Sequence, residues 1–141
     1  MQQMFFEAAA FNADISKWDT SAVIKMGGTF FEAVAFNADI SDWNTSAVTN
    51  MGYMFSVNDA TDATAFNANI SDWDTSAVAD MGYMFKGSTA FNADITNWNT
   101  AALTSSSGMF EGATAWLKAY ARADSITTDF AGPPTIWKLR S

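Results

Sequence analysis

The sequence predicts an α/β solenoid, a curved stack of about five 25-residue strand–turn–helix coils followed by a C-terminal segment outside the repeat. The first observation is repetition, because the phrase Ala-Phe-Asn-Ala-Asp-Ile-Ser-x-Trp, or a close variant, begins at residues 10, 35, 65 and 90. The second is spacing, which is 25 residues with one insertion of five. The third is composition, since 49% of the residues are hydrophobic and 12 are Phe, enough for a continuous core.

Aligning the copies turns each apolar position into a column of like residues. Two columns are wholly aromatic over the four copies of the phrase: Phe11, Phe36, Phe66 and Phe91, and Trp18, Trp43, Trp73 and Trp98. Identical rings pack well if successive coils lie directly over one another, because each ring then covers its counterpart and excludes water. We therefore interpret both columns as structural core.

The helix of each coil is expected to follow the phrase. Four apolar residues of the second copy have the spacing of one helical stripe: Val48, Met51, Met54 and Phe55. Thr45 or Ser46, just before them, is a natural N-cap. Gly27, Gly52 and Gly82 share one column inside this helix, and we interpret them as a close approach between neighbouring helices.

Residues 39–43 read as a brief strand, with an Ile and a Trp on either side of small polar residues. Parallel strands lie about 4.8 Å apart, whereas a helix with its side chains is about 10 Å wide. A stack of such units must therefore bend, with the strands on its concave side, as in leucine-rich repeats. The variable positions of that side form the candidate binding face: Lys17, Asp42, Asp72 and Asn97.

The repeat pattern also divides the chain. The solenoid is expected to span residues 1–126, with an insertion loop at 56–64 and a degenerate last repeat at 113–126. Residues 127–141 have no repeat register, and they either cap the last coil or reach for a partner. The candidate contacts of this tail are Phe130, Pro133, Pro134 and Trp137.

Charge argues against several partners. The net charge is −8, and residues 1–117 hold 13 acidic side chains against three basic ones. Nucleic acid and anionic lipid surfaces both require a basic footprint, so neither is expected as a partner. No apolar run is long enough to cross a membrane, so we expect no membrane insertion. No secretory signal is visible at the N-terminus.

Catalysis is not expected, and no catalytic residue is assigned. The chain has no Cys and no His. Its carboxylates fall mostly in repeated columns, whereas an acid–base pair needs two unlike environments. Asp59 and Asp62 of the insertion loop supply too few oxygens for Ca²⁺, which takes six or more. We therefore expect neither a metal site nor a cofactor.

The polar columns favour structural roles. One column of asparagines lies beside the phenylalanine column and is expected to hydrogen-bond one coil to the next: Asn12, Asn37, Asn67 and Asn92. Another column alternates acid and amide just before a threonine, which suggests helix capping: Asp19, Asn44, Asp74 and Asn99. Rows of hydroxyl side chains and outward-facing tryptophans would instead suit ice or glycan binding, which are remote alternatives.

The combined columns, written FNxDISxWDTSxVxxMxxMF, resemble those of the BspA-like leucine-rich-repeat surface proteins, in the branch typified by mycoplasma lipoprotein domains of unknown function. The resemblance covers residues 1–112. It implies a non-catalytic solenoid, often on surface or secreted proteins and implicated in adhesion or protein binding. An extracellular or cell-surface location follows from the resemblance, whereas the missing signal leaves an intracellular or organellar location open.

Two functions remain in view at this point. The leading hypothesis is a non-enzymatic scaffold that binds a protein partner through the concave face. The alternative is a peripheral structural subunit of a larger multiprotein complex, which contacts its neighbours through the C-terminal tail and the insertion loop.

Overall fold

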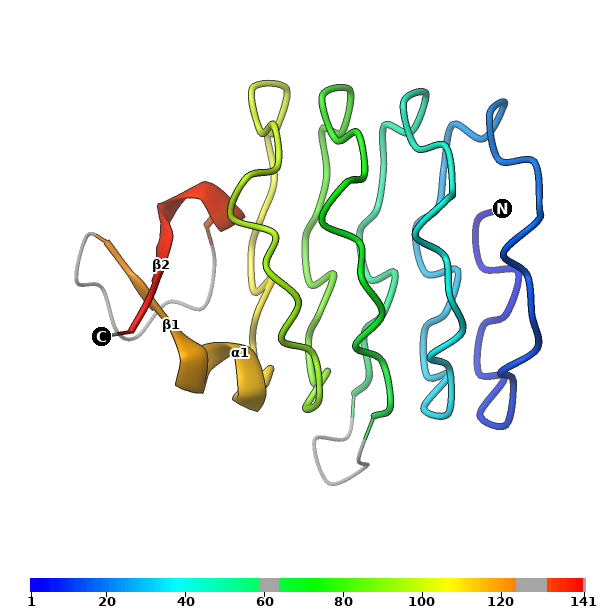
Figure 1. Ribbon diagram of the computed structural model, residues 1–141, viewed down its shortest axis with the longest axis horizontal. Helices are drawn as coiled ribbons and strands as arrows, with labels where there is room; N and C mark the ends of the chain where they lie inside the picture. Colours follow the sequence, from blue (N-terminus) through cyan, green and yellow to red (C-terminus); the bar gives the residue numbers. More distant parts are fainter. Residues whose placement is uncertain (59–63, 124–131, 141) are drawn as a thin grey trace.

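The structure, a computed structural model, describes residues 1–58, 64–123 and 132–140. Figure 1 shows the repeats as layers that stand side by side along the long axis, with the N-terminus at one end and the named elements at the other. These elements are α1 (Thr114–Ala119), β1 (Tyr120–Arg122), the 3-10 helix Pro134–Ile136 and β2 (Trp137–Leu139). Strands β1 and β2 pair antiparallel, with Tyr120 opposite Leu139.

The predicted α/β solenoid of strand–turn–helix coils is wrong. In the described residues up to 113, the backbone consists of turns and irregular segments, without a helix or a strand. Regular pairing between the layers is limited there to three isolated parallel bridges, Lys25–Asn50, Asn50–Asp80 and Asp80–Ser105. The width mismatch that was expected to bend the stack therefore does not arise, and there is no concave face of strands.

Backbone conformation explains why the expected helix does not form. Residues with left-handed φ recur four positions apart: Gln3 and Glu7, Gly28 and Glu32, Tyr83 and Gly87, and Gly108 and Gly112. An α-helix requires right-handed dihedrals throughout, so this recurrence breaks it at every turn. The amides alternate as well: Thr29 N–H donates to Met26 O in its own layer at 3.1 Å, whereas Phe30 N–H donates to Met54 O of the next layer at 2.9 Å.

Each layer has two limbs. The phrase limbs are residues 10–24, 35–49, 65–79 and 90–104, and the Met limbs are residues 1–9, 25–34, 50–58, 80–89 and 105–113. The strand expected at 39–43 in the second phrase limb is a turn, because Trp43 N–H donates to Ile40 O at 3.2 Å. Asp39 Oδ1 sets up this turn by accepting hydrogen bonds from Ser41 N–H at 3.0 Å and Ser41 Oγ at 2.7 Å.

The core consists of side chains that repeat from layer to layer. Trp73 stacks on Trp43 and on Trp98 with ring centroids 6.4 Å apart in both pairs. Its indole Nε1–H donates to Ile40 O of the preceding layer at 3.1 Å, and the indoles of Trp43 and Trp98 make the equivalent bond. Phe36, Phe66 and Phe91 are also buried, but Phe11 is half-buried and Trp18 is 42% exposed.

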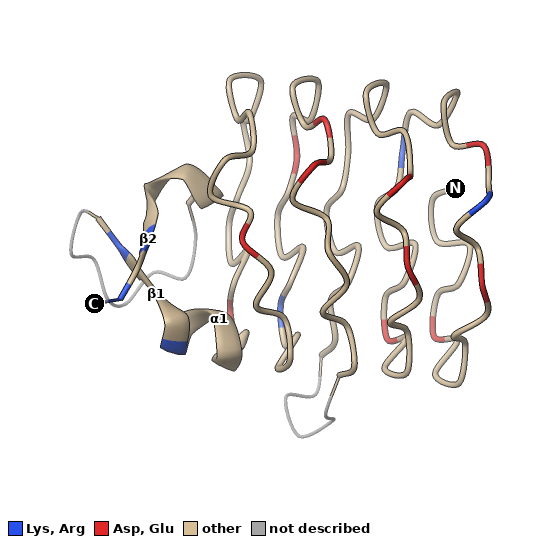
Figure 2. Cartoon of the chain, in the orientation of Figure 1, with Lys and Arg blue, Asp and Glu red and all other residues tan. Residues whose placement is uncertain are grey.

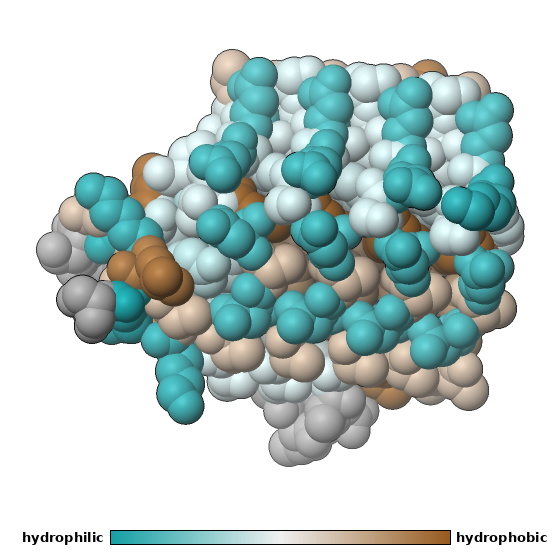
Figure 3. All heavy atoms as spheres, in the orientation of Figure 1, coloured by the Kyte–Doolittle hydropathy of each residue, from teal (hydrophilic) through white to brown (hydrophobic). Residues whose placement is uncertain are grey.

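Polar side chains connect the layers at the surface of the phrase limbs, where Figure 3 shows hydrophilic rows running across the stack. Asn12 Oδ1 accepts the backbone N–H of Asn37 at 2.8 Å, and the same bond joins Asn37 to Asn67 and Asn67 to Asn92. The buried Thr45 hydroxyl donates to Asp74 O at 2.9 Å. The expected coil-to-coil asparagine bonds are thus present, whereas the threonine bonds the next layer rather than capping a helix.

Gly27, Gly52 and Gly82 lie where adjacent Met limbs approach each other, not where helices pack. A Cβ on Gly27 would lie 2.5 Å from Asn50 Oδ1, and one on Gly52 would lie 3.4 Å from Gly82 O. The expected close approach between helices is therefore wrong, because these glycines lie where turns of adjacent layers come close.

The turn-forming aspartates predict a loss of stability in acid. Hydrogen bonds from Ser16 to the Asp14 carboxylate, and from Ser41 to the Asp39 carboxylate, lower the pKa of both carboxyl groups below the usual value. A carboxyl group whose pKa is lower in the folded state stabilises the fold above its unfolded pKa of about 3.9. This stabilisation is lost as the pH falls through the folded value. We therefore expect the urea midpoint to fall below about pH 4.

Asn69 occupies the same column and provides the matched control. Its Oδ1 accepts Ser71 N–H at 3.1 Å, so an amide forms the same turn without titrating. The variant Asp39→Asn should fold normally at neutral pH and lose less stability in acid than the parent chain. An equal acid loss in both proteins would show that these turns do not cause it.

The C-terminal elements cover the last layer. Trp116 of α1 is fully buried and stacks on Phe110 at 4.6 Å and on Phe91 at 5.7 Å. Trp137 of β2 is 5% exposed and meets Phe110 edge-on at 5.2 Å. The described part of the tail, residues 132–140, therefore lies against the repeats.

Candidate functional site

The residues expected to form the binding face remain at the surface. Lys17, Asp42, Asp72 and Asn97 are all exposed at one position of successive phrase limbs. Lys17 Nζ lies 3.6 Å from Asp42 Oδ2, with both side chains at least 75% exposed. An ion pair this exposed contributes little to stability.

The residues expected to form the tail contacts differ in how deeply they are buried. Pro133 is half-buried, Pro134 is buried, and Trp137 is packed in the core cluster. Phe130 lies outside the described residues, as do Asp59 and Asp62 of the insertion loop. Within the described part of that loop, Ser56 and Val57 are buried.

The described residues offer no metal centre, because they contain no group of three or more His, Cys, Asp or Glu side chains that could hold an ion. They also contain no helix of sufficient length and apolarity to cross a membrane.

A row of aromatic side chains lies on the outer surface of the Met limbs. This aromatic ridge consists of Phe6, Phe31, Tyr53 and Tyr83, with consecutive ring centroids 4.7, 6.5 and 5.0 Å apart. Phe6 is 41% exposed and Tyr53 is 46% exposed, whereas Phe31 and Tyr83 are half-buried. Large aromatic side chains lining an exposed surface are typical of recognition sites.

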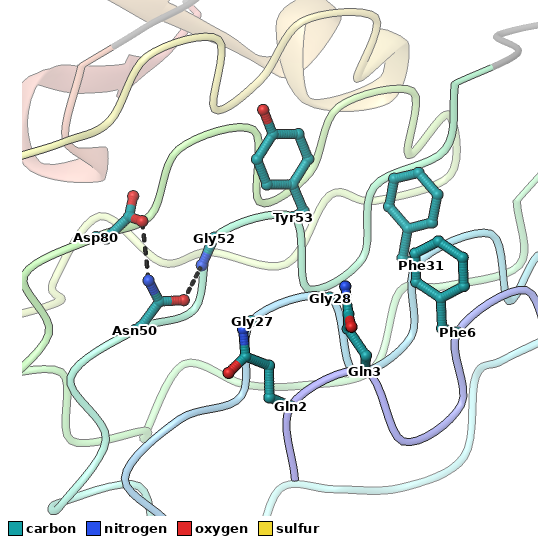
Figure 4. Close-up of a pocket in the computed structure, with 10 residues that line it drawn as sticks. All are labelled: Gln2, Gln3, Phe6, Gly27, Gly28, Phe31, Asn50, Gly52, Tyr53 and Asp80. Atoms are coloured by element: carbon teal, nitrogen blue, oxygen red, sulfur yellow. Dashed lines mark hydrogen bonds between the residues drawn. The ribbon is translucent and has the colours of Figure 1, made fainter.

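A shallow groove of about 240 Å³ runs beside the ridge, as Figure 4 shows. Gly27, Gly28 and Gly52 contribute backbone to its lining. Gln2, Gln3, Asn50 and Asp80 form its polar part. Asn50 Nδ2 donates to Asp80 Oδ2 at 2.9 Å. Asp80 Oδ1 also accepts Gly82 N–H at 2.9 Å, and Asn50 Oδ1 accepts Gly52 N–H at 3.2 Å. These bonds hold a carboxylate and an amide in fixed positions beside apolar rings.

Two residues of the ridge have an unfavourable backbone conformation. Tyr53 has φ of 57° and Tyr83 has φ of 54°. The same column holds Gln3, with φ of 56°, and Gly28 and Gly108, with φ of 61° and 57°; glycine adopts these angles without strain. A left-handed residue with a Cβ costs about 1–2 kcal/mol. Bulky side chains retained at such positions suggest a function for the side chains.

Charge around the groove favours a cationic ligand. Figure 2 shows acidic residues distributed over the layers, and basic residues both on the C-terminal elements and, more sparsely, in the layers. One cation already contacts the ridge: Lys86 Nζ lies 5.5 Å from the Tyr83 ring centroid and 3.3 Å from Glu111 Oε1. The molecule thus contains an example of an ammonium group held between an aromatic ring and a carboxylate.

The alignment of the repeats does not by itself predict this site. Its strongest signal was the substitution of tyrosine for glycine within one column, in Met-Gly-Tyr-Met-Phe at 51–55 and 81–85 against Met-Gly-Gly-Thr-Phe at 26–30. That column was assigned to a helix, where left-handed φ does not occur.

Layers of near-identical sequence, joined by the same hydrogen bonds at each junction, define a repeat protein. Residues 1–62 and 59–128 match the family described as "Mycoplasma protein of unknown function, DUF285". The chain belongs to this family. No curated protein and no solved structure matches the chain.

Proposed function

We propose that the chain is a non-enzymatic module that binds a protein partner through the aromatic ridge and its groove. The observation that carries this proposal is the left-handed backbone of Tyr53 and Tyr83, two stacked tyrosines in a column that holds glycine at residues 28 and 108. Strain of this kind lowers the free energy of unfolding. We therefore expect the two tyrosine side chains to contribute binding free energy that offsets this loss. Tyrosine contributes strongly to many protein interfaces.

The proposed partner segment is extended and carries Lys or Arg. Asp80 supplies a carboxylate in the groove, and the excess of acidic side chains in residues 1–117 attracts cations over a longer range. A guanidinium or ammonium group can lie against the ridge as Lys86 does against Tyr83.

The resemblance to BspA-like surface proteins also supports a recognition role. Glycan binding is less well supported, because Trp43, Trp73 and Trp98 are buried and the ridge rings largely cover one another's faces. The structural-subunit alternative depended on contacts through the tail and the insertion loop. Trp137 of the tail is buried against the chain's own repeats, and residues 59–63 of the loop lie outside the described residues. The aromatic ridge is therefore the better-supported contact surface.

The double variant Tyr53→Gly/Tyr83→Gly tests the proposal. The probe is a peptide of four Arg-Pro units, with four Glu-Pro units as its control, and binding is measured by isothermal titration calorimetry. Each lost cation–π contact removes about 0.5–1 kcal/mol, so we expect binding of the basic peptide to weaken by about tenfold. The free energy of unfolding should not decrease, because glycine removes the backbone strain.

The matched control variant is Lys17→Ala/Asp42→Ala, which changes exposed residues of the phrase limbs. It should bind the basic peptide like the parent chain. Undiminished binding by the tyrosine variant, or equal binding of the acidic peptide, would rule out the aromatic ridge as a site for basic segments.

A further inference from the structure

One column of the Met limbs forms a row of side chains with a gap in it. The column consists of Gln3, Gly28, Tyr53, Tyr83 and Gly108, all with left-handed φ. Tyr53 stacks on Tyr83 with ring centroids 5.0 Å apart. A Cβ on Gly108 would overlap the Tyr83 ring, so this ring leans over the glycine of the following layer. The side chains of the column are therefore inclined toward the next layer.

Gln3 is inclined in the same direction. A Cβ on Gly28 would lie 3.3 Å from Gln3 Cγ and 3.9 Å from Phe31 Cβ, with no atom of the Tyr53 ring within 4 Å. Figure 4 shows Gly28 between Gln3 and Tyr53. Because glycine has no side chain, the space between the Gln3 side chain and the Tyr53 ring is left open. We call this space the Gly28 slot.

The slot has the thickness of one planar group. Ring centroids of adjacent layers on this surface are 4.7 Å apart for Phe6 and Phe31 and 5.0 Å apart for Tyr53 and Tyr83. Gln3 and Tyr53 are two layers apart, and contacting carbon atoms lie about 3.5–4.0 Å from each other, so one planar group fits between them. The whole groove, at about 240 Å³, is smaller than the usual ligand pocket of about 300–1,000 Å³. It suits a single side chain.

The polar side of the groove offers hydrogen-bond acceptors and a negative charge. Asn50 Nδ2 donates to Asp80 Oδ2, which leaves Asn50 Oδ1 beside Gly27, where a Cβ would lie 2.5 Å from it. Asp80 has the one charged side chain among the described residues that line the groove. A neutral ring in the slot would take these acceptors out of water without replacing their hydrogen bonds. A guanidinium group is planar and donates from all of its nitrogens.

We propose that the Gly28 slot receives one arginine side chain of the partner segment. This inference rests on the proposed function and assigns the residue that the groove recognises. The guanidinium plane would lie between the Gln3 amide and the face of Tyr53, with Asn50 Oδ1 and the Asp80 carboxylate on the side of its donors. Lysine fits less well, because an ammonium group has neither the plane nor the fork of donors.

The two tyrosines then have different parts in binding. Tyr83 is covered on one face by Tyr53 and leans over Gly108 with the other. Tyr53 is 46% exposed, and its face toward Gly28 meets only the edge-on ring of Phe31, with centroids 6.5 Å apart. Tyr53 is therefore the ring that contacts the arginine, and Tyr83 supports it from behind.

The test titrates the isotope-labelled full chain with the peptide Gly-Pro-Arg-Pro-Gly and follows its backbone amide signals by nuclear magnetic resonance. We expect the signals of Gly27, Gly28 and Gly52 to shift, and those of Gly87 and Gly112, elsewhere on the Met limbs, to stay in place. Matched peptides carry Lys or Phe instead of Arg. Each should bind about threefold to fivefold more weakly or worse, because each lacks the stacked cation or its hydrogen bonds.

The variant Gly28→Tyr fills the slot from within the chain. Tyr53 and Tyr83 show that this column accepts tyrosine with left-handed φ. The variant should fold, as judged by an unchanged indole signal of Trp73, and the Arg peptide should no longer shift the Gly52 amide. If the variant does not fold, the comparison of the three peptides on the parent chain decides the question by itself.

The inference is overturned if the Lys or the Phe peptide binds as tightly as the Arg peptide, or if folded Gly28→Tyr binds the Arg peptide like the parent chain. The proposed function survives either result when Tyr53→Gly/Tyr83→Gly still loses binding of the peptide of four Arg-Pro units. Undiminished binding by that double variant as well would remove both.

Discussion

The variant Phe55→Ala is expected to lower the free energy of unfolding by about 3–5 kcal/mol, the usual range for removing a buried aromatic ring. Phe55 is 4% exposed and stacks on Phe66 within its layer at 3.7 Å. It also stacks on Phe30 and Phe85 of the two adjacent layers at 5.6 and 5.8 Å. Since a domain is stable by about 5–15 kcal/mol in total, this loss is a large part of the whole.

Phe6→Ala is the matched control for Phe55→Ala, because it removes the same ring from a position that is 41% exposed. This variant should lower the free energy of unfolding by less than about 1.5 kcal/mol, because less apolar area of the Phe6 ring is buried in the folded chain. Urea unfolding followed by tryptophan fluorescence measures both variants. Equal losses would mean that Phe55 is not enclosed between layers.

The variant Gly87→Ala is expected to be the next most damaging. Gly87 has φ of 69°, and a Cβ there would lie 2.5 Å from Val57 Cγ2 and 2.6 Å from the backbone oxygen of Val57. The left-handed backbone costs about 1–2 kcal/mol for a residue with a Cβ, and overpacking adds about 1–3 kcal/mol. We expect a total loss of about 2–5 kcal/mol in the free energy of unfolding.

Gly28→Ala separates the two contributions. Gly28 has φ of 61°, but a Cβ there would meet no backbone atom, and its closest neighbour would be Gln3 Cγ at 3.3 Å. Only the conformational cost of about 1–2 kcal/mol should remain. If Gly28→Ala proved as damaging as Gly87→Ala, the close contact between Gly87 and Val57 would not be the cause.

The burial of the repeat columns could be predicted from the sequence, because apolar side chains are buried whether the backbone is helical or not. Val48, Met51, Met54 and Phe55 are buried, although no helix carries them. Two different backbones bury the same sequence positions. One is a helix with an apolar stripe, and the other is a series of tight turns with left-handed residues four positions apart. The spacing alone therefore could not distinguish the two backbones.

The deciding information was the conformation of a few residues whose types do not reveal it. Glu32 and Tyr53 adopt left-handed φ, which neither residue favours, so the sequence carries no local signal for it. The asparagine column was interpretable, because a short amide side chain that repeats beside a core position suits bonds between layers. Its role followed from residue chemistry and did not depend on the fold class.

The binding surface was the least predictable part. The expected face rested on strands that do not form, and Lys17 and Asp42 are exposed neighbours on turns of adjacent phrase limbs. The aromatic ridge arises because turns in adjacent Met limbs bring Phe31 and Tyr53 to the same surface from different columns. Such a combination depends on backbone geometry that the alignment of repeats does not contain.

The central claim is that the repeats stack in register as layers of turns. The most direct measurement is a set of nuclear Overhauser contacts around the Trp73 indole N–H. Layers of turns in register should give contacts to Ile40, which lies 33 residues earlier and accepts this proton. They should give no helical amide contacts along residues 47–56. Contacts of Trp73 confined to its sequence neighbours, or a continuous helical pattern from 47 to 56, would contradict the account.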